Sequence, residues 1–425
     1  MLVDLIVHNA SQLVTCASPY GPKRGADMTD LGIIEDGAIA IKDGQIVAVG
    51  PTREVRIEHA ARHLLDASGR VVCPGFVDCH THVVYAGDRS GEFEKRIRGV
   101  TYMEILQSGG GILNTVRATR EASEAELIAE ARGRLDIMLK AGTTTVEAKT
   151  GYGLEPETEM KMLRVIAELD RTHAANLVPT FLGAHAIPLD YRERVDDYVA
   201  LVEQQMIPAA HDWYESSRFA AGGVPMFVDV FCEDGVFSVE QSRRVLAAAV
   251  RRGLPVKAHV DEFVSLGGVT MALQLRATSV DHLDVTNERD LARIAASGTV
   301  AVPLPAVNFH LGTPHYANAR ALINGGAALA LATDLNPGSA PCYSMPLVMA
   351  IACRYQQMRP AEALNAATVN AAYAVGLGDR LGALETGKQG DVLVLDMPDY
   401  RHLAYYLGWN PVMHVIKRGQ IVHSA

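Results

Sequence analysis

The central part of this sequence alternates short β-branched runs with stretches of helical periodicity, and this alternation restricts the fold most strongly. An apolar run at residues 71–77 opens the series. Seven further candidate strands follow near residues 143–147, 177–182, 226–231, 255–259, 278–281, 299–303 and 328–333. Eight strands, each followed by a helix over ~300 residues, predict an α/β fold of the (β/α)8 TIM-like barrel type. The periodicity alone also allows an open doubly wound sheet.

Helix-start signals lie between the predicted strands. Ser123 with Glu126, and Ser238 with Gln241, have the spacing of a capping box. Pro156 suits the first turn of another helix. These signals favour a regular succession of strand and helix.

Both ends of the chain have strand patterns without intervening helices. The runs lie at residues 5–7, 38–41 and 46–49 near the N-terminus, and at residues 391–395, 412–416 and 421–422 near the C-terminus. Neither end has enough apolar surface to fold alone. We therefore expect residues 1–70 and 385–425 to form one small composite β-sandwich domain, beside a barrel of residues 71–384.

The charge balance argues against several kinds of partner. The 425 residues include 39 Lys and Arg against 49 Asp and Glu, which gives a formal net charge of −10, and basic residues never exceed two in a row. Nucleic acids and anionic membranes both require clustered positive charge, so we expect neither as a partner.

Two features favour a cytoplasmic location. The first apolar run contains Asp4 and follows no basic region, unlike a secretory signal, and no stretch of ~18 uncharged apolar residues occurs. The six cysteines form no C-x-x-C pair, which is typical of reduced, mostly buried thiols.

Histidines and carboxylates stand where the predicted strands end. His80 and His82 close the first strand, and residues i and i+2 of an extended chain project to the same side. The later strand ends add His259, Glu262, His282 and Asp334. Because strand ends converge in a barrel, three imidazoles and a carboxylate indicate a site for one divalent ion, zinc or iron(II), with a position left for water.

The segments around these positions resemble the amidohydrolase superfamily. Within it, narrower segments resemble the imidazolonepropionase family, and the resemblance extends from Cys73 to Val412. These segments are YAGDR at 85–89, EAKTGYG at 147–153, FLGAH at 181–185, VFCE at 230–233 and ATDLNPGS at 332–339.

The resemblance implies a hydrolase of histidine degradation that opens the ring of 4-imidazolone-5-propanoate to give N-formimidoyl-L-glutamate. The metal ligands that it implies are His80, His82, His259 and Asp334. Glu262 and His282 would then lie beside the reacting ring. Asp334 and His282 are candidates for accepting a proton and stabilising the oxyanion, and Glu262 for holding a ring nitrogen and carrying a proton to it. The sequence leaves open which of them is the general base.

The propionate of this substrate requires a local cation in an acidic protein. Arg89, on the loop after the first strand, is the best placed, since a guanidinium matches a carboxylate in bidentate geometry. The other substrate contacts that the resemblance implies are Tyr102, Tyr152, His185, Glu262, Asn336, Gly338 and Ser339. The last three would offer loop amides.

Some residues receive a plainer interpretation. Lys149 could be a carboxylated lysine that bridges two metals, but that bridge is expected two strands later, so we expect a single metal. His310 and His315, after the seventh predicted strand, are expected to be exposed loop histidines, and the alternative is that they border the pocket. Gly109–Gly111 is either the hinge of a lid or a flexible loop.

Two other functions fit the motifs in part. A purine or pyrimidine deaminase shares the metal pattern, but it needs groups that read a base edge, where this sequence offers Arg89 with tyrosines. An inactive scaffold barrel would have lost metal ligands, and all the expected ligands are present. A homodimer is expected from the resemblance alone.

Overall fold

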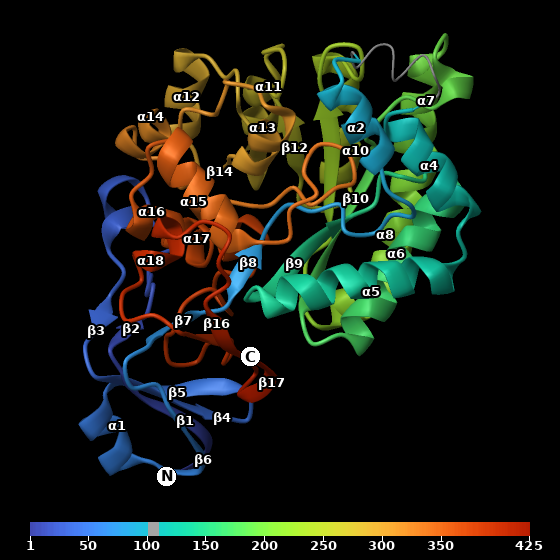
Figure 1. The fold of residues 1–425 in the computed structure, drawn as a ribbon. Helices are drawn as coiled ribbons and strands as arrows, with labels where there is room; N and C mark the ends of the chain where they lie inside the picture. Colours follow the sequence, from blue (N-terminus) through green and yellow to red (C-terminus); the bar gives the residue numbers. More distant parts are fainter. Residues whose placement is uncertain (101–109) are drawn as a thin grey trace.

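The computed structural model describes residues 1–100 and 110–425, and its centre is a parallel sheet (Figure 1). This sheet has seven strands in the order β14-β13-β12-β11-β10-β9-β8, so that each strand pairs with the next one along the chain. The strands are β8 (Phe76–Asp78), β9 (Thr143–Lys149), β10 (Asn176–Ala184), β11 (Phe227–Cys232), β12 (Lys257–Val260), β13 (Ser279–His282) and β14 (Val300–Val302). Because all the pairs are parallel, their carboxyl ends lie at one edge.

The eighth predicted strand, near residues 328–333, closes this sheet into a TIM-like barrel. Single parallel bridges join the segment to β14 on one side and to the residues after β8 on the other. Between the bridges, the amide of Leu331 donates to the carbonyl of Ala366 and the amide of Thr333 to Asp78, both at 3.1 Å. The prediction of a regular strand here is therefore wrong, because these amides bond to a helix and a side chain and not to a strand ladder.

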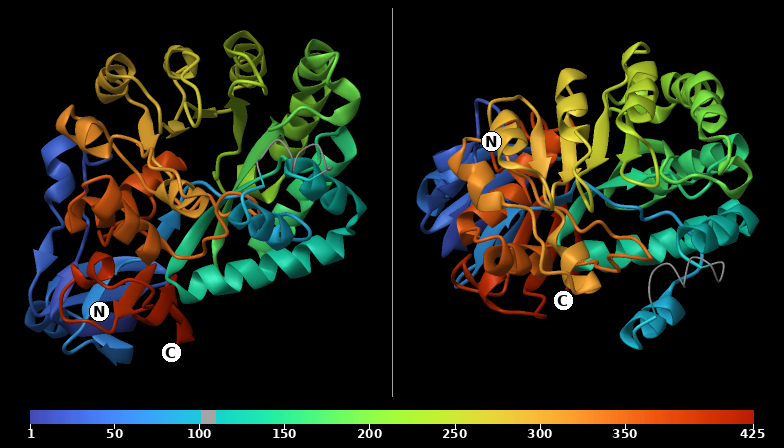
Figure 2. Two further views of the ribbon diagram at one scale, coloured as in Figure 1. Left: turned by 45° about the horizontal axis from the view of Figure 1, so that its top comes forward. Right: turned by 90° about the horizontal axis from the view of Figure 1, so that it is seen from above.

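Helices surround the barrel strands (Figure 2). Those of the barrel region are α2 (Ser90–Ile97), α4 (Ile112–Glu121), α5 (Glu124–Lys140), α6 (Pro156–Thr172), α7 (Val195–Leu201), α8 (Ile207–Glu215), α9 (Arg218–Ala221), α10 (Val239–Val250), α11 (Gly268–Gln274), α12 (Glu288–Ala295), α13 (Pro305–Leu311), α14 (Ala319–Asn324), α15 (Met345–Tyr355), α16 (Pro360–Ala366) and α17 (Val369–Ala374). The capping boxes of Ser123 and Ser238 are confirmed at the starts of α5 and α10. None of the helices in the described residues has the length and apolar composition needed to cross a bilayer.

Two further sheets lie below the barrel in Figure 1. One has the order β5-β4-β1-β6 and the other β17-β16-β15-β7-β2-β3. Their strands are β1 (Leu2–Ala10), β2 (Gln12–Val14), β3 (Ile33–Ile34), β4 (Gly37–Lys42), β5 (Gln45–Pro51), β6 (Ala60–Asp66), β7 (Val71–Pro74), β15 (Val392–Leu395), β16 (Val412–Lys417) and β17 (Gln420–Ser424), with helices α1 (Thr52–Glu58) and α18 (His402–Tyr405). The second sheet thus combines strands from both ends of the chain.

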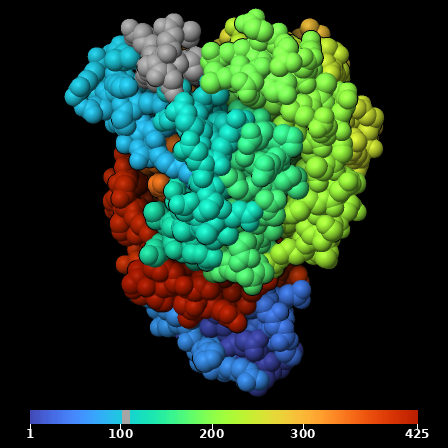
Figure 3. Space-filling view, turned by 90° about the vertical axis from the view of Figure 1, so that its right-hand side faces the viewer, coloured from blue at the N-terminus to red at the C-terminus, as the bar shows by residue number. Residues whose placement is uncertain are grey.

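The two ends also share apolar contacts. Leu5, Ile39, Val392 and Ile416 belong to one cluster of buried side chains. In the space-filling view of Figure 3, C-terminal residues lie between the N-terminal residues and the barrel. These contacts support the composite β-sandwich domain, which we retain as a proposal.

The predicted first strand, residues 71–77, divides at Gly75. Residues 71–74 form β7, which pairs with β15 and β2, and only β8 belongs to the barrel. A Cβ atom at Gly75 would lie 2.2 Å from Thr144 Oγ1, so the chain passes between the two sheets at a residue that must lack a side chain. We therefore propose that the domain boundary follows residue 74 and not residue 70.

Candidate metal centre and active site

The four predicted metal ligands meet at the carboxyl edge of the barrel sheet. His80 and His82 follow β8, His259 lies in β12, and Asp334 follows the eighth barrel segment. Asp334 Oδ1 lies 3.4 Å from His80 Nε2 and 3.3 Å from His82 Nε2. His259 Nε2 lies 3.5 Å from His82 Nε2. All four side chains are buried, so they share one small enclosed space.

The donor atoms in this space suit a divalent ion. His80 Nε2 and Asp334 Oδ1 are buried, yet neither has a hydrogen-bond partner within the described ranges. Two sets of three ligand atoms lie within 4.8 Å of one another, and His80 belongs to both, once with His82 and His259 and once with His282 and Asp334. Imidazole nitrogens with one carboxylate are a typical ligand set for zinc or iron(II).

Two buried carboxylates hold the imidazoles from the other side. Asp281 Oδ2 lies 2.6 Å from His80 Nδ1, and Asp229 Oδ2 lies 3.0 Å from His259 Nδ1. A carboxylate at Nδ1 favours the tautomer in which Nε2 carries the free lone pair, and it fixes the orientation of the ring. Both histidines therefore present Nε2 to the shared space.

Three residues at these strand ends have left-handed backbone conformations. The φ angle is +56° at Asp261, +79° at His282 and +51° at Asp334. Such conformations cost about 1–3 kcal/mol for residues other than glycine, and they concentrate at functional sites. Their position here supports the assignment of the site to this edge of the barrel.

Glu262 lies beside His282 at the edge of the cluster. Glu262 Oε2 is 3.7 Å from His282 Nε2. Burial raises the pKa of Glu262 well above its ordinary value, and the charges of Asp334 and Asp284 raise it further. A carboxyl group whose pKa is raised towards the working pH is suited to proton transfer.

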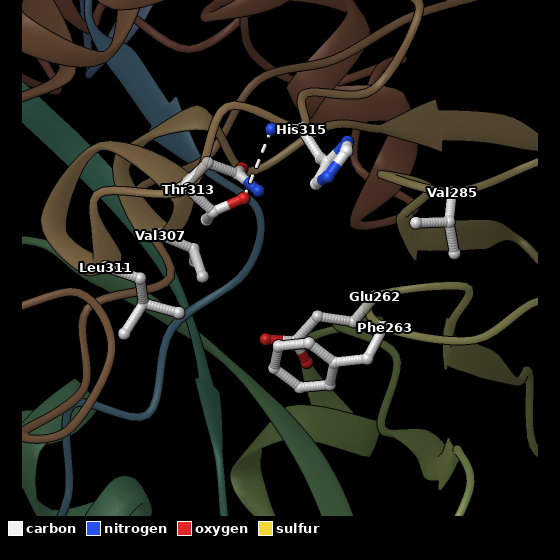
Figure 4. A pocket seen from close by; sticks show the side chains of 8 residues that line it. Glu262, Phe263, Val285, Val307, Leu311, Thr313 and His315 are labelled. Atoms are coloured by element: carbon white, nitrogen blue, oxygen red, sulfur yellow. Dashed lines mark hydrogen bonds between the residues drawn. The ribbon is translucent and has the colours of Figure 1, made fainter. Parts of the chain in front are cut away.

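A pocket of about 220 Å³ borders Glu262, whose carboxyl group points into it (Figure 4). The other lining residues are Phe263, Val285, Val307, Asn308, Leu311, Thr313 and His315. His315 is exposed, as predicted. The same prediction is wrong for His310, which lies in α13, is only partly exposed and has Nε2 3.1 Å from Arg96 Nη2.

Glu233 fixes the loop that carries Glu262, a role that the sequence did not reveal. Its carboxylate accepts hydrogen bonds from the amides of Phe263 at 2.9 Å and Val264 at 3.0 Å. Glu233 follows β11 directly and is buried. Its signals in the sequence were its place after a predicted barrel strand and its position in the segment VFCE, and neither indicated this contact.

His185 and Tyr152 form one wall of the site. The ring of His185 stacks on that of His82 with centroids 4.7 Å apart, and Tyr152 lies 5.3 Å from His185 by the same measure. His185 Nδ1 lies 2.9 Å from the carbonyl of Gly151. Burial lowers the pKa of His185 well below its ordinary value, and neighbouring His82 and His259 lower it further. His185 is therefore neutral, with Nδ1 donating to the carbonyl.

Arg89 lies at the start of α2, next to the loop after the eighth barrel segment. Its Nε donates to Glu92 Oε2 at 2.8 Å. A Cβ atom added at Gly338 would lie 2.1 Å from Arg89 Nη1, so the guanidinium occupies space that only glycine leaves free. Arg89 thus keeps its terminal nitrogens beside the predicted substrate loop.

The amides of the predicted substrate loop bond within the loop itself. The amides of Gly338 and Ser339 both donate to Asn336 Oδ1 at 2.8 Å. Asn336 Nδ2 in turn donates to the carbonyl of Asp334 at 2.7 Å. The asparagine side chain thus uses both amides to shape the loop, and a contact between this loop and the substrate stays a prediction.

Three predictions remain, on Tyr102, on Gly109–Gly111 and on Lys149. Tyr102 and Gly109 lie outside the described residues. Gly111 is described, and its amide donates to Glu92 Oε1 at 2.9 Å. Lys149 is fully buried between Glu147 and Asp229, with Nζ 2.7 Å and 2.8 Å from their carboxylates.

Comparisons with known proteins identify the family. The profile of the amidohydrolase family matches residues 71–422. An adenosine deaminase from Xanthomonas campestris with bound zinc has the same fold, with a TM-score of 0.74 and 22% identity over 99% of this chain and 93% of that chain. Guanine deaminase from E. coli has a TM-score of 0.72 and 17% identity over 99% of both chains. The chain belongs to the amidohydrolase family.

Curated relatives define a narrower group within this family. A protein of Chloroflexus aggregans is 59% identical over 99% of this chain and 98% of its own length, and one of Herpetosiphon aurantiacus is 49% identical over 99% and 97%. Both are named imidazolonepropionase. This similarity places the chain among the imidazolonepropionases.

Proposed function

We propose that this protein hydrolyses the ring of 4-imidazolone-5-propanoate to N-formimidoyl-L-glutamate in histidine degradation. The main support is a buried cluster of histidines and Asp334 at the carboxyl edge of the barrel sheet. Arg89 lies at the same edge, with its guanidinium against Gly338. The names of relatives at 59% and 49% identity support the choice of reaction.

The reaction adds one water across the carbon–nitrogen bond of a cyclic amide, and the leaving nitrogen gains a proton. A divalent ion held by His80, His82, His259 and Asp334 would polarise the carbonyl group and lower the pKa of water. One of Asp334 and His282 accepts the proton from water, and an imidazole N–H of His282 donates to the negative charge that develops on the carbonyl oxygen. Glu262, whose raised pKa favours the protonated form, holds a ring nitrogen and delivers a proton to it.

The substrate's propionate pairs with Arg89. The side chain of Arg89 is 16% exposed, so a carboxylate that reaches it loses much of its hydration and gains a charge-assisted pair of hydrogen bonds. Tyr152 and His185 contact the ring from the wall beside His82, and Tyr102, Asn336, Gly338 and Ser339 complete the substrate site. The site therefore selects a small anionic molecule.

We also propose the bound ion, the cellular location and the oligomeric state. One zinc or iron ion binds each chain, the protein acts in the cytoplasm, and it forms a homodimer. The six cysteines, all within the described ranges, are free thiols, which fits a reducing compartment. Tyr405, Tyr406 and Trp409 form an exposed aromatic group with ring centroids 4.9 Å and 5.4 Å apart, which supports association.

An assay of the product tests the function directly. Purified, metal-loaded protein is expected to convert 4-imidazolone-5-propanoate into N-formimidoyl-L-glutamate, identified by mass spectrometry. Release of ammonia from adenosine or guanine, without opening of the imidazolone ring, would favour a deaminase. Absence of both activities in metal-loaded protein would favour an inactive barrel.

A further inference from the structure

The interior of the barrel beneath the two histidines His80 and His259 is charged. TIM barrels usually fill this space with branched apolar side chains. Here it contains five fully buried charged residues from four strands, which we call the charged floor: Glu147, Lys149, Asp229, Lys257 and Asp281. Burying so many charges is costly unless they are paired, so their arrangement calls for a functional explanation.

The charged floor forms a continuous path between two metal ligands. Lys149 Nζ lies 2.7 Å from Glu147 and 2.8 Å from Asp229, and Asp229 contacts His259. Lys257 Nζ lies 3.6 Å from both Glu147 and Asp281, and Asp281 contacts His80.

Lys257 also reaches the backbone beside the metal ligands. Its Nζ donates to the carbonyl of Cys79 at 2.6 Å, directly before His80. The floor thus supports the ligands through both their imidazoles and their backbone.

We propose that Lys149 and Lys257 are positioning residues of the metal site, which set the charge beneath the ion and hold the two aspartates that orient its histidines. This inference rests on the proposed metal site. Three carboxylates and two ammonium groups leave the charged floor with one formal negative charge. Without the lysines that charge would be three, next to Asp334, which adds another.

The aspartates and the lysines therefore affect metal binding in opposite directions. Asp229→Asn removes a negative charge and the carboxylate at His259 Nδ1, and both changes weaken binding. Lys257→Met removes a positive charge, while Asp281 keeps its contact with His80 and accepts a hydrogen bond from Ser279 Oγ at 2.6 Å. The bond from Lys257 to the carbonyl of Cys79 is lost, but Asp281 still holds the ring of His80, so the added negative charge outweighs this loss and binding becomes tighter.

The test is competition for zinc between metal-free protein and a chelating dye, combined with thermal unfolding with and without zinc. We expect Asp229→Asn to bind zinc about 10–100-fold more weakly than the wild type. We expect Lys257→Met to bind it on the order of tenfold more tightly, since a buried unit charge acts through a low effective dielectric. Zinc should raise the unfolding temperature less in the first variant and more in the second.

Lys417→Met is the matched control. Lys417 Nζ lies 2.6 Å from Asp391, and both side chains are buried in the end sheets, away from the metal site. This variant should lower the unfolding temperature equally with and without zinc. If Lys257→Met does not fold, the double variant Lys257→Met/Asp229→Asn retains the net charge and should bind zinc more tightly than Asp229→Asn alone.

The outcomes separate this inference from the proposed function. Equal affinities of wild type, Asp229→Asn and Lys257→Met, or weaker binding in both variants, would overturn the role of the charged floor and leave the metal site intact. The role of the charged floor would also be overturned if the double variant bound zinc no more tightly than Asp229→Asn. A wild-type protein that binds no zinc or iron would instead overturn the proposed metal-dependent function.

Discussion

At the residue scale, Glu262 illustrates how burial selects a chemical role. Its carboxyl group faces a mostly apolar pocket, and within the described residues its one ion-pair contact is with His282. An acid whose pKa is raised in the folded state favours folding while it stays protonated. That contribution is present below the unfolded pKa, near 4.5, and it is lost as the pH rises towards the folded pKa.

Glu262→Gln should therefore change the pH dependence of stability. The amide does not ionise, so the variant should gain stability relative to the wild type as the pH rises from about 5 to 8. Urea unfolding of both proteins at several pH values measures this difference. A difference that is constant with pH would contradict the raised pKa.

The same substitution separates chemistry from metal binding. Glu262→Gln retains the shape of the side chain but removes the proton that it delivers, so kcat should fall by about 10²–10⁴ with full metal content. Steady-state kinetics with parallel elemental analysis tests this. A variant with nearly wild-type kcat would remove Glu262 from the mechanism.

The choice of substrate depends on the proposed ion pair between Arg89 and the propionate. Arg89→Met leaves the propionate unpaired, so the transition-state stabilisation calculated from kcat/KM should fall by roughly 2–5 kcal/mol. Arg89→Lys should restore only part of this stabilisation, since an ammonium group cannot form the bidentate hydrogen bonds of a guanidinium. A ring analogue without the carboxylate is the control, because Arg89→Met should hardly affect its turnover. Equal losses for both substrates would mean that Arg89 supports the fold and not the propionate.

Most side chains that meet at the candidate site could be predicted because each stands at the end of a strand in the sequence. His80, His82, His259 and Asp334 carried that signal. Asp229 and Asp281 did not, since a carboxylate inside a buried strand does not reveal which side chain it pairs with. The use of the loop amides by Asn336 also depends on backbone geometry that the sequence does not encode locally.

At the scale of elements, the loop after the eighth barrel segment and the start of α2 fit each other closely. The contact between Arg89 and Gly338 leaves no room for a Cβ atom. The carbonyl of Gly338 also accepts a hydrogen bond from Arg96 Nη2 at 3.0 Å. The position of Arg89 therefore depends on a residue almost 250 positions away in the chain.

Gly338→Ala should consequently displace Arg89 and raise KM for the substrate, with a smaller change for the analogue that lacks the carboxylate. The metal content should not change, because Gly338 contacts no metal ligand that we propose. Unchanged kinetics in Gly338→Ala would contradict the close fit.

The regular barrel strands could be predicted from the sequence, but the break at Gly75 and the irregular eighth segment could not. β9 to β14 are short, mostly buried runs separated by helices, and the alternation indicates them within a few residues. The break at Gly75 and the irregular eighth segment depend on long-range contacts, with Thr144 in one case and Ala366 and Asp78 in the other. A uniformly apolar run contains no information about such partners.

At the scale of the whole molecule, the end sheets and the barrel meet around the start of β9. A Cβ atom at Gly142, whose φ is +94°, would lie 2.9 Å from both Leu393 of β15 and Phe76 of β8. The chain thus brings its last strands against the first barrel strands. The metal site lies at the opposite, carboxyl edge of the barrel sheet, where loops can vary without disturbing this junction.

The central claim is that a single ion in the cluster of His80, His82, His259 and Asp334 makes the ring-opening reaction possible. The most direct measurement is metal content per chain, together with ring-opening activity, in wild type and His259→Ala. We predict about one zinc or iron ion per wild-type chain, activity that rises in proportion to occupancy, and loss of both in a folded His259→Ala variant. Two ions per wild-type chain, full metal content in His259→Ala, or ring opening by metal-free protein would contradict the account.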